Sequence, residues 1–432
     1  MLPLFFPPPP PVAAVLATAM TIQAQPQTFT NPIIYADFPD NDISLGPDGT
    51  YYFSASSMHY SPGAPILQSR DRINWQVIGH SVPSLYFGDN YNNQSAYNLG
   101  TWVSTLRYRQ SNRKWYWIGC ANLWTTYVYT TSSEEVTGPW TQEAAFQPCF
   151  YDCGLLIDDD GDETIVAQLS PDGLSIARPT GEPDGVTLVW KASDPFGPYE
   201  YKVLNDNVPS PTEAGWYFMS FAWNYPLGRV PVFAPITWGE DGFPTLVTVD
   251  GEWGESYPFP GLVEYPTPSW KGTDTFSGET LSPDWQWNHN PDVEKCALNN
   301  PGLRLYTATV TDDLYLARNT LAHQLHGLYG ILELDVAGMG DGDDRAGLAA
   351  LKDSSACYRI AVAHGLTMES SYGPTLSNGS IVATADVPEG QTNIWLRVSM
   401  DAAAAGSHEA VLGYSFDGVE FTDLGETYAD DG

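Results

Sequence analysis

Short runs of β-branched and aromatic residues recur along the 432 residues of this chain, and clusters of Gly, Pro, Asn and Asp separate them. Hardly any segment repeats its apolar residues at the 3.6-residue spacing of an amphipathic helix. Runs of this kind between turn residues are typical of antiparallel strands. The sequence therefore predicts an all-β protein, long enough for two domains that each have a hydrophobic core.

A loose repeat in the first half of the chain places a strand, a Ser-acid turn and an aromatic residue in the same order. Its three copies are residues 66–71 followed by Trp75, residues 128–133 followed by Trp140, and residues 189–194 followed by Tyr199. Repeats of this length with several strands apiece are typical of the blades of a β-propeller.

The repeats stop near residues 265–268, and a second strand-rich region follows. Alternating strands are expected there at residues 303–306, 330–334, 358–362 and 393–398. Two packed sheets of such strands form a β-sandwich. We therefore expect a propeller domain over residues 28–265 and a sandwich domain over residues 270–432.

The charge balance restricts the partners of the protein. The chain has 52 acidic and 18 basic residues, which gives a formal net charge of -34. Such a charge repels nucleic acids and anionic membrane surfaces, and it leaves uncharged polymers as partners. The chain also has 15 Trp and 25 Tyr residues, whose rings combine an apolar body with a polar group.

The first 24 residues are expected to be a signal peptide, because an apolar run at residues 12–17 is followed by the small-residue pattern that ends at Ala24. Pro7 to Pro11 and the lack of a basic residue before the run depart from the usual form. No later apolar run reaches about 18 residues, so no membrane span is expected. We therefore expect a secreted protein.

Five cysteines, Cys120, Cys149, Cys153, Cys296 and Cys357, are too few and too scattered for a disulfide scaffold. One or two disulfides stay open as alternatives in an oxidising compartment. Their spacing also lacks the paired pattern of a metal site.

One stretch identifies the family that the chain resembles. Residues 31–44 place three carboxylates in a tight turn, and residues 50–55 form a strand directly after it. Together with residues 58–75, this block resembles the opening blade of glycoside hydrolase family 43, whose five-bladed propellers include β-xylosidases and α-L-arabinofuranosidases. Within the family it is most similar to fungal arabinofuranosidases that act on arabinoxylan.

The resemblance implies an inverting hydrolase for arabinofuranosyl or xylosyl linkages of plant arabinoxylan, with a five-bladed propeller. It also implies two internal deletions. Almost nothing separates residues 176–178 from the third repeat, and residues 209–214 run directly into residues 215–219, where relatives carry an additional strand. Parts of two blades are therefore expected to be missing. We expect the protein to be a monomer.

Inversion requires one carboxylate that activates water and a protonated carboxyl on the opposite face of the sugar, roughly 6.5 to 9.5 Å away. The resemblance assigns the general base to Asp40 and makes Asp37 and Asp42 turn-forming or supporting residues. It assigns to Asp152 the aspartate that orients the acid, since a neighbouring negative charge raises the pKa of a carboxylic acid. Both aspartates are thus catalytic candidates.

The general acid itself has no clear candidate. The Glu-Gly motif of the family should fall between Ala177 and Val186, and no such motif is there. Glu182 is the only glutamate in that interval, but its surroundings are those of a turn. Glu200 and Glu213 match non-catalytic positions of the family.

Two substrate-binding candidates also come from the resemblance. Trp102 stands where relatives place an aromatic wall beside the sugar, and Arg229 where they place a pocket arginine. A tryptophan covers the apolar face of a sugar, and an arginine binds hydroxyls or orients a carboxylate. His323 and His326 are the one histidine pair at metal-ligand spacing, and they lie in the expected sandwich, so we expect neither a metal nor a cofactor.

Two alternatives stay open beside the hydrolase. A propeller that keeps its sugar contacts but lacks the acid would bind xylan without cleaving it. A lectin-like propeller unrelated to hydrolysis would have no pair of acids facing a common axis.

Overall fold

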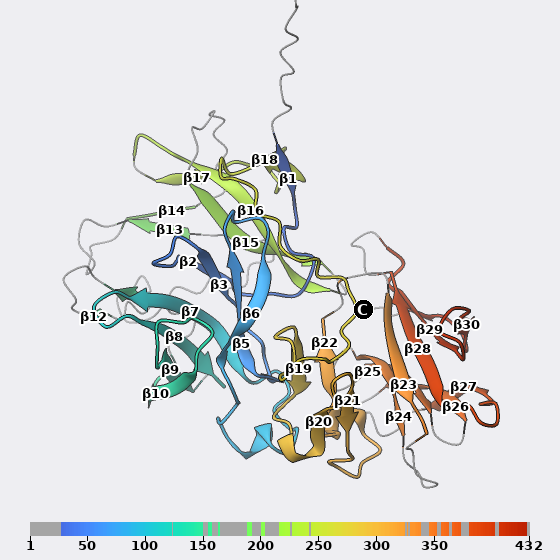
Figure 1. Cartoon of the computed structure of the whole chain (residues 1–432). Coiled ribbons are helices and arrows are strands. Elements are labelled where there is room, and N and C mark those ends of the chain that lie inside the picture. Colours follow the sequence, from blue (N-terminus) through green and yellow to red (C-terminus); the bar gives the residue numbers. More distant parts are fainter. Residues whose placement is uncertain are drawn as a thin grey trace, which may run out of the picture.

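The computed structural model describes residues 27–122, 124–149, 154–157, 163–164, 188–191, 200–203, 216–224, 227–241, 243–324, 326, 329–337, 345–351, 356–362, 365–372, 380–401 and 406–429. These residues form strands β1 to β31 and three single-turn 3₁₀ helices, and no α-helix occurs among them (Figure 1). The all-β prediction is therefore confirmed. Within the same residues, no helix is long and apolar enough to cross a membrane.

Two complete four-stranded antiparallel sheets come first in the chain. The first sheet consists of β2 (Asp42–Leu45), β3 (Tyr51–Ser54), β5 (Gly63–Ser69) and β6 (Gln76–Val82). The second consists of β7 (Thr101–Arg109), β8 (Lys114–Ala121), β9 (Thr125–Thr131) and β10 (Trp140–Phe146). Each sheet follows chain order, which is the arrangement of a propeller blade.

Three smaller sheets follow in the chain. They are the pair β11 (Leu156–Ile157) and β12 (Glu163–Thr164), the pair β13 (Leu188–Lys191) and β14 (Glu200–Val203), and the three strands β15 (Tyr217–Asn224), β16 (Gly228–Trp238) and β17 (Pro244–Leu246). The two segments in which we infer deletions lie outside the described residues. The number of blades stays a prediction.

The first strand joins the end of this series of sheets to its beginning. Strand β1 (Thr28–Thr30) pairs with β18 (Ser256–Pro258), so residues more than 220 positions apart lie side by side. Asn31 extends the contact, because its side-chain amide donates to the carbonyl oxygens of Phe233 and Gly254, both at 2.9 Å. This junction closes the sheets into a ring.

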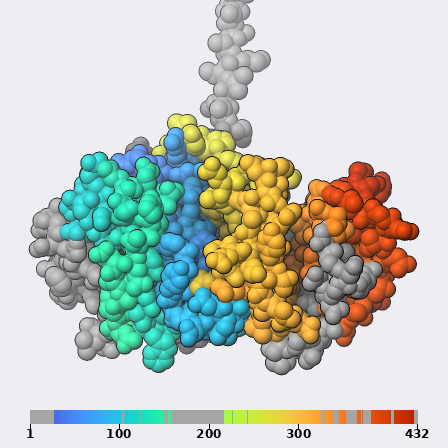
Figure 2. Space-filling view, turned by 60° about the horizontal axis from the view of Figure 1, so that its bottom comes forward, coloured from blue at the N-terminus to red at the C-terminus, as the bar shows by residue number. Residues whose placement is uncertain are grey.

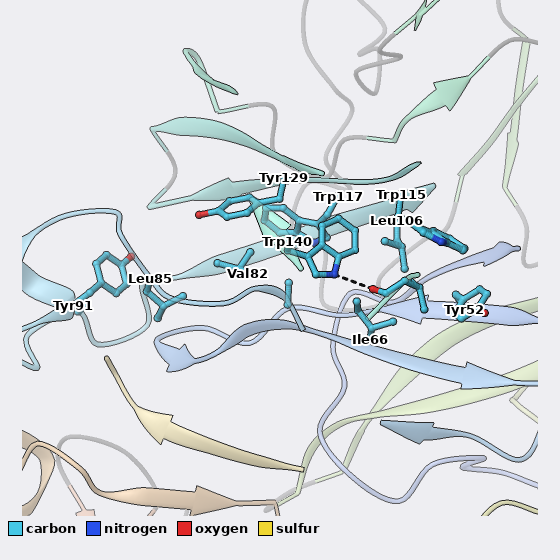
Figure 3. Close-up of a cluster of buried hydrophobic side chains, with 13 residues drawn as sticks. Tyr52, Ile66, Val82, Leu85, Tyr91, Leu106, Trp115, Trp117, Tyr129 and Trp140 are labelled. Atoms are coloured by element: carbon cyan, nitrogen blue, oxygen red, sulfur yellow. Dashed lines mark hydrogen bonds between the residues drawn. The ribbon is translucent and has the colours of Figure 1, made fainter. Parts of the chain in front are cut away.

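The largest hydrophobic core lies between the first two sheets (Figure 3). Trp115 and Trp117 from β8 are almost fully buried there. Tyr52 contacts Trp115 edge to face, with ring centroids 4.7 Å apart. Burying each such side chain contributes about 1.5–3 kcal/mol, so this core holds the two blades together.

The Ser-acid turn of the sequence repeat has a local cause in the first blade. The Asp71 carboxylate accepts hydrogen bonds from the backbone N–H groups of Ile73 and Asn74, at 2.9 and 2.7 Å, and from the Ser69 hydroxyl at 3.0 Å. A short acidic side chain that binds the backbone two residues on is a standard turn-forming device. The turn delivers Trp75 to a buried position just before β6.

The last part of the chain forms two further sheets that enclose a separate core. One contains β23 (Tyr329–Asp335), β28 (Asn393–Met400), β29 (Glu409–Ser415), β30 (Thr422–Asp423) and β31 (Tyr428–Ala429). The other contains β24 (Ala346–Leu351), β25 (Ala356–Val362), β26 (Leu366–Tyr372) and β27 (Ser380–Ala385). They pack as a β-sandwich, orange to red in Figure 1.

A segment between the ring and the sandwich packs directly on the first blade. Strand β19 (Trp285–Asn288) pairs with β22 (Leu321–His323) on one side and with the short β4 (Tyr60–Ser61) on the other. The rest of the segment contains β20 (Cys296–Leu298), β21 (Leu303–Leu305) and the 3₁₀ turns η2 (Val293–Lys295) and η3 (Leu314–Leu316). Figure 2 shows these yellow to amber residues against the blue N-terminal sheets. The third 3₁₀ turn, η1 (Asp89–Tyr91), lies earlier in the chain, between β6 and β7.

One disulfide joins Cys120 to Cys149 across the second blade. Cys296 is a free, partly buried thiol. Cys153 lies outside the described residues.

Candidate active site

The acidic turn before β2 carries Asp40 in a left-handed backbone conformation. Its φ angle is 55°, a value that Asp and Asn adopt more readily than most side chains do. Phe38 anchors the turn, because its buried ring packs on Phe53 with centroids 6.1 Å apart. The Ser56 N–H donates to the carbonyl oxygen of Pro39 at 3.1 Å, which ties the turn to the end of β3.

The carboxylate of Asp40 has two described partners. Arg229 Nη1 donates to Asp40 Oδ1 at 2.7 Å, and the Ser56 hydroxyl donates to Oδ2 at 2.8 Å. The side chains of Asp40 and Arg229 are 16% and 17% exposed. A charge-assisted bond between two groups that are mostly withdrawn from water is stronger than a surface ion pair. The carboxylate is therefore held in one orientation and still reached by solvent.

Arg229 is positioned by the same turn. Its backbone N–H donates to Asp37 Oδ1 at 2.6 Å, and its carbonyl oxygen accepts from the Phe38 N–H at 3.1 Å. The preceding Gly228 has a φ of 97°, and a Cβ there would lie 2.5 Å from Asp37 Oδ1. Only glycine fits this close approach, so the start of β16 is shaped to bring Arg229 to Asp40.

Asp37 itself is a buried acid. Burial raises the pKa of Asp37 above its usual value of 3.8, the Arg229 N–H and charge oppose that shift, and the Asp40 charge adds to it. Its backbone carbonyl accepts from Gln324 Nε2 at 2.9 Å. Trp270 packs on Phe38 with ring centroids 5.7 Å apart. Residues after the ring thus support the acidic turn from outside.

Asp42 faces the second blade. Its carboxylate accepts from the guanidinium of Arg107, from the Thr105 hydroxyl at 3.0 Å and from the Leu106 N–H at 3.1 Å. These contacts bind the first blade to β7. The supporting roles expected of Asp37 and Asp42 in the turn stay predictions.

Trp102 is half-buried at the second position of β7. The neighbouring Thr101 carbonyl accepts from the Ser57 N–H at 3.1 Å, and Ser57 follows the serine that binds Asp40. The start of β7 therefore adjoins the Asp40 site. Asp152 lies outside the described residues, as do Glu182 and Glu213, so the structure brings together Asp40, Arg229 and the strand end that bears Trp102.

A buried histidine pair beside β4 was missed by the sequence reasoning. The rings of His59 and His289 lie 4.6 Å apart and are both buried. Burial lowers the pKa of His59 to about 3, with a further contribution from His289, and burial lowers the pKa of His289 to about 4. The Ala96 N–H donates to His289 Nε2 at 3.1 Å, which requires a neutral ring. The string Asn288-His289-Asn290-Pro291 carried no signal beyond that of a turn.

Within the described residues, no group of three or more His, Cys, Asp or Glu side chains is placed to hold a metal ion. The rings of His323 and His326 contact each other at 5.3 Å between centroids, and His326 also packs on Trp270. The expectation that this pair lies in the sandwich is wrong, because β22 belongs to the sheet with β19 and β4, and His326 packs on the tryptophan that contacts Phe38 of the acidic turn.

A closed ring of sheets, a following β-sandwich and an arginine-bound carboxylate in an acidic turn together define a two-domain glycoside hydrolase. Comparison with known proteins supports this class. Residues 29–178 match the model of glycosyl hydrolases family 43, and residues 273–430 match that of the β-xylosidase C-terminal concanavalin A-like domain. The chain belongs to glycoside hydrolase family 43.

A solved family 43 structure, engineered in its active site to display both endo-xylanase and exo-arabinofuranosidase activity, has a TM-score of 0.81 and 34% identity. The match covers 94% of this chain and 93% of that one. A β-xylosidase of Formosa agariphila is 25% identical over 93% of this chain and 84% of its own length. The arabinofuranosidase BoGH43B of Bacteroides ovatus is 25% identical over 61% of this chain and 62% of its own. The predicted propeller followed by a β-sandwich is thus confirmed.

Proposed function

We propose that the protein is an inverting glycoside hydrolase that removes arabinofuranosyl or xylosyl units from plant arabinoxylan. The observation that carries the proposal is the Asp40 carboxylate, held by Arg229 and Ser56 at 2.7 and 2.8 Å and still open to solvent. The named activities of the similar proteins, β-xylosidase and arabinofuranosidase, support this substrate class. The arabinofuranosidase among these similar proteins supports arabinose as the released sugar, and the β-xylosidase supports xylose.

In this mechanism Asp40 is the general base. Its Oδ2 accepts a hydrogen bond from the Ser56 hydroxyl and its Oδ1 accepts one from Arg229, and these two bonds fix the orientation of the carboxylate. A water beside it would lose a proton to the carboxylate as it attacks the anomeric carbon. Asp152 is proposed to orient the acid on the opposite face of the sugar, and Trp102 to cover that sugar.

The binding module remains a second candidate because of one specific observation. The interval between Ala177 and Val186 lacks the Glu-Gly motif that supplies the acid in the family. Loss of a general acid reduces a rate by about 10² to 10⁴. A propeller without it would bind xylan and cleave only substrates with good leaving groups.

The experiment compares an aryl arabinofuranoside, an aryl xyloside and natural arabinoxylan, with the anomeric form of the first product read by proton NMR. Inverted product from both an aryl glycoside and the polymer supports the hydrolase. Cleavage of the aryl glycoside alone, with retained binding of the polymer, favours the impaired propeller. Retention of the anomeric configuration would overturn the inverting mechanism. If the protein showed no binding and no cleavage of any of these substrates, both candidate functions would be overturned.

Secretion and the monomeric state belong to the same proposal. An extracellular enzyme meets cell-wall arabinoxylan directly, and the N-terminal pattern that ends at Ala24 supports export. Sequencing the N-terminus of the secreted protein tests the first point, and light scattering of the purified chain tests the second.

A further inference from the structure

Trp223 lies beside the arginine that binds Asp40. It stands on β15 directly opposite Arg229 on β16, as its Cα partner. Paired residues of an antiparallel ladder project from the same face of the sheet. The guanidinium carbon of Arg229 accordingly lies 5.7 Å from the centroid of the Trp223 ring, and 5.3 Å from that of Phe221.

The exposed fraction differs sharply between Trp223 and the two residues of the ion pair. Trp223 is 77% exposed, whereas Arg229 and Asp40 are 17% and 16% exposed. A single exposed tryptophan elsewhere on a surface would need no explanation. This one is distinguished by its contact with Arg229, so that Asp40, Arg229 and Trp223 form a continuous row from a nearly buried carboxylate to solvent.

We propose that Trp223 forms the wall of the leaving-group subsite, where its indole face stacks on the xylose unit that follows the scissile bond. This inference rests on the proposed function, because Asp40 marks the place of the sugar that is released. A substrate whose reacting sugar reaches Asp40 must pass its remaining units outward, and Trp223 is an exposed aromatic surface beside Arg229 for them to contact. The C–H face of a pyranose stacks well on an indole.

Arg229 gives the wall its orientation. A guanidinium that is fixed on Asp40 and lies against the indole holds the ring by cation–π attraction. Trp102 belongs to a different sheet, on β7, and is the candidate for the released sugar itself. The two tryptophans would therefore contact different units of the substrate, and Trp223 would select for the polymer over a free pentose.

The test measures equilibrium binding by titration calorimetry on the full chain, with a xylo-oligosaccharide that carries arabinose as one probe and free arabinose and xylose as others. The reference protein and every variant compared with it carry Asp40→Asn, so that the oligosaccharide is not cleaved during the titration. We expect Trp223→Ala to weaken binding of the oligosaccharide about tenfold and to leave binding of the free pentoses unchanged. Trp223→Phe should recover part of the loss, since it keeps a stacking ring.

Trp216→Ala is the matched control. Trp216 is 64% exposed and lies just before the other end of β15, next to Trp238 with ring centroids 5.5 Å apart. This variant should bind all probes as the reference protein does.

Equal oligosaccharide affinity of Trp223→Ala and the reference protein would overturn the subsite and leave the proposed function standing. A parallel loss for oligosaccharide and free pentose would also overturn it, because a leaving-group wall does not touch the released sugar. If the reference protein bound none of the probes, the proposed function would fail and the subsite with it.

Discussion

Arg229 Nη1 donates to Asp40 Oδ1 at 2.7 Å, although the two residues are 189 positions apart in the chain. The pairing of β1 with β18 brings the start of the ring against its end and thereby sets this contact. Asn41 adds to it, since its amide donates to the Ser220 carbonyl on β15 at 3.1 Å. The site therefore combines the acidic turn at the start of the ring with the sheet of β15, β16 and β17 near its end.

Replacement of Asp40 separates its chemical role from its backbone role. Asp40→Asn should reduce kcat/KM on an aryl arabinofuranoside by about 10² to 10⁴. It should lower the melting temperature through loss of the ion pair with Arg229, but by less than Asp40→Ala does, since Asn adopts a φ of 55° readily. Asp40→Ala should lose as much activity and in addition about 1 kcal/mol of folding stability. Thermal unfolding beside steady-state kinetics checks both. An Asp40→Asn variant of full activity would exclude Asp40 as the base.

Gly228→Ala should disrupt the contact between Asp37 and Arg229. Its new Cβ would lie 2.5 Å from Asp37 Oδ1, at a φ of 97°. The matched control is Gly251→Ala, at a φ of 86° with nothing within 4 Å of the new Cβ. Both variants carry the backbone strain, about 1–2 kcal/mol, and only Gly228→Ala adds the collision.

Chemical denaturation of the two glycine variants and kcat/KM on the aryl substrate measure the difference. We expect the Gly228 variant to be less stable than the Gly251 variant and to be the only one with reduced activity. Equal activity in both would show that Asp37 does not position Arg229 for catalysis.

The buried histidines predict a loss of stability in acid. The pKa of His59 is lowered to about 3 and that of His289 to about 4, from 6.5. The unfolded chain therefore binds more protons than the folded chain between about pH 6.5 and pH 4, and stability falls as the pH drops through that window. Each histidine contributes up to about 1.4 kcal/mol per pH unit. The pKa of His80 and of His326 is also lowered, to about 3 and about 4, and acts in the same direction.

His59→Phe tests this effect. Phenylalanine retains an aromatic ring against Tyr60, whose centroid lies 4.5 Å from that of His59, and cannot bind a proton. The free energy of unfolding, measured by denaturant titration at pH 7, 6, 5 and 4.5, should fall less steeply in the variant. The raised pKa of Asp37 acts in the opposite sense, since its contribution is lost as pH rises. An identical pH dependence in the variant and the unmodified protein would show that His59 does not take up a proton when the protein unfolds.

Local chemistry made part of this structure predictable from the sequence. Asp71 binds the backbone of residues only two and three positions away, so one short segment of sequence determines both the turn and the end of the strand before it. The acidic turn at Asp40 is equally local, and its resemblance to family 43 led to Arg229 as well. The catalytic and binding roles of Asp40, Asp152, Trp102 and Arg229 stay predictions.

Long-range pairing was the part that one sequence could not provide. Asn288, His289 and Asn290 have the composition of an exposed turn, yet all three are buried against the first blade. The sequence did not indicate a role for Trp223 either, because that role depends on its position opposite Arg229 in the neighbouring strand. The end of the sequence repeats predicts a domain division near residues 265–270. It does not predict that β19, which follows this point, pairs with β4 of the first half of the chain.

Asn290 should stabilise the ring, although it lies beyond the last ring strand. Its amide accepts from the Leu85 N–H at 2.9 Å and donates to the Leu85 carbonyl at 2.9 Å and to Asn92 Oδ1 at 3.1 Å. Asn290→Ala leaves the buried Leu85 groups without these partners, which costs about 1–3 kcal/mol per unsatisfied group. Differential scanning calorimetry should show unfolding of the ring at a lower temperature.

The control for Asn290 is Asn393→Ala, which removes one exposed hydrogen bond, at 2.8 Å, to Glu333 within the sandwich. It should change the melting temperature by less than the Asn290 variant does, because water replaces an exposed partner. If both variants melted like the unmodified protein, the insertion of residues 288–290 would not stabilise the first blade. His59 and Asp37 each contact a residue beyond the ring, through their backbone carbonyl oxygens. We therefore expect the ring and the segment that follows it to unfold together.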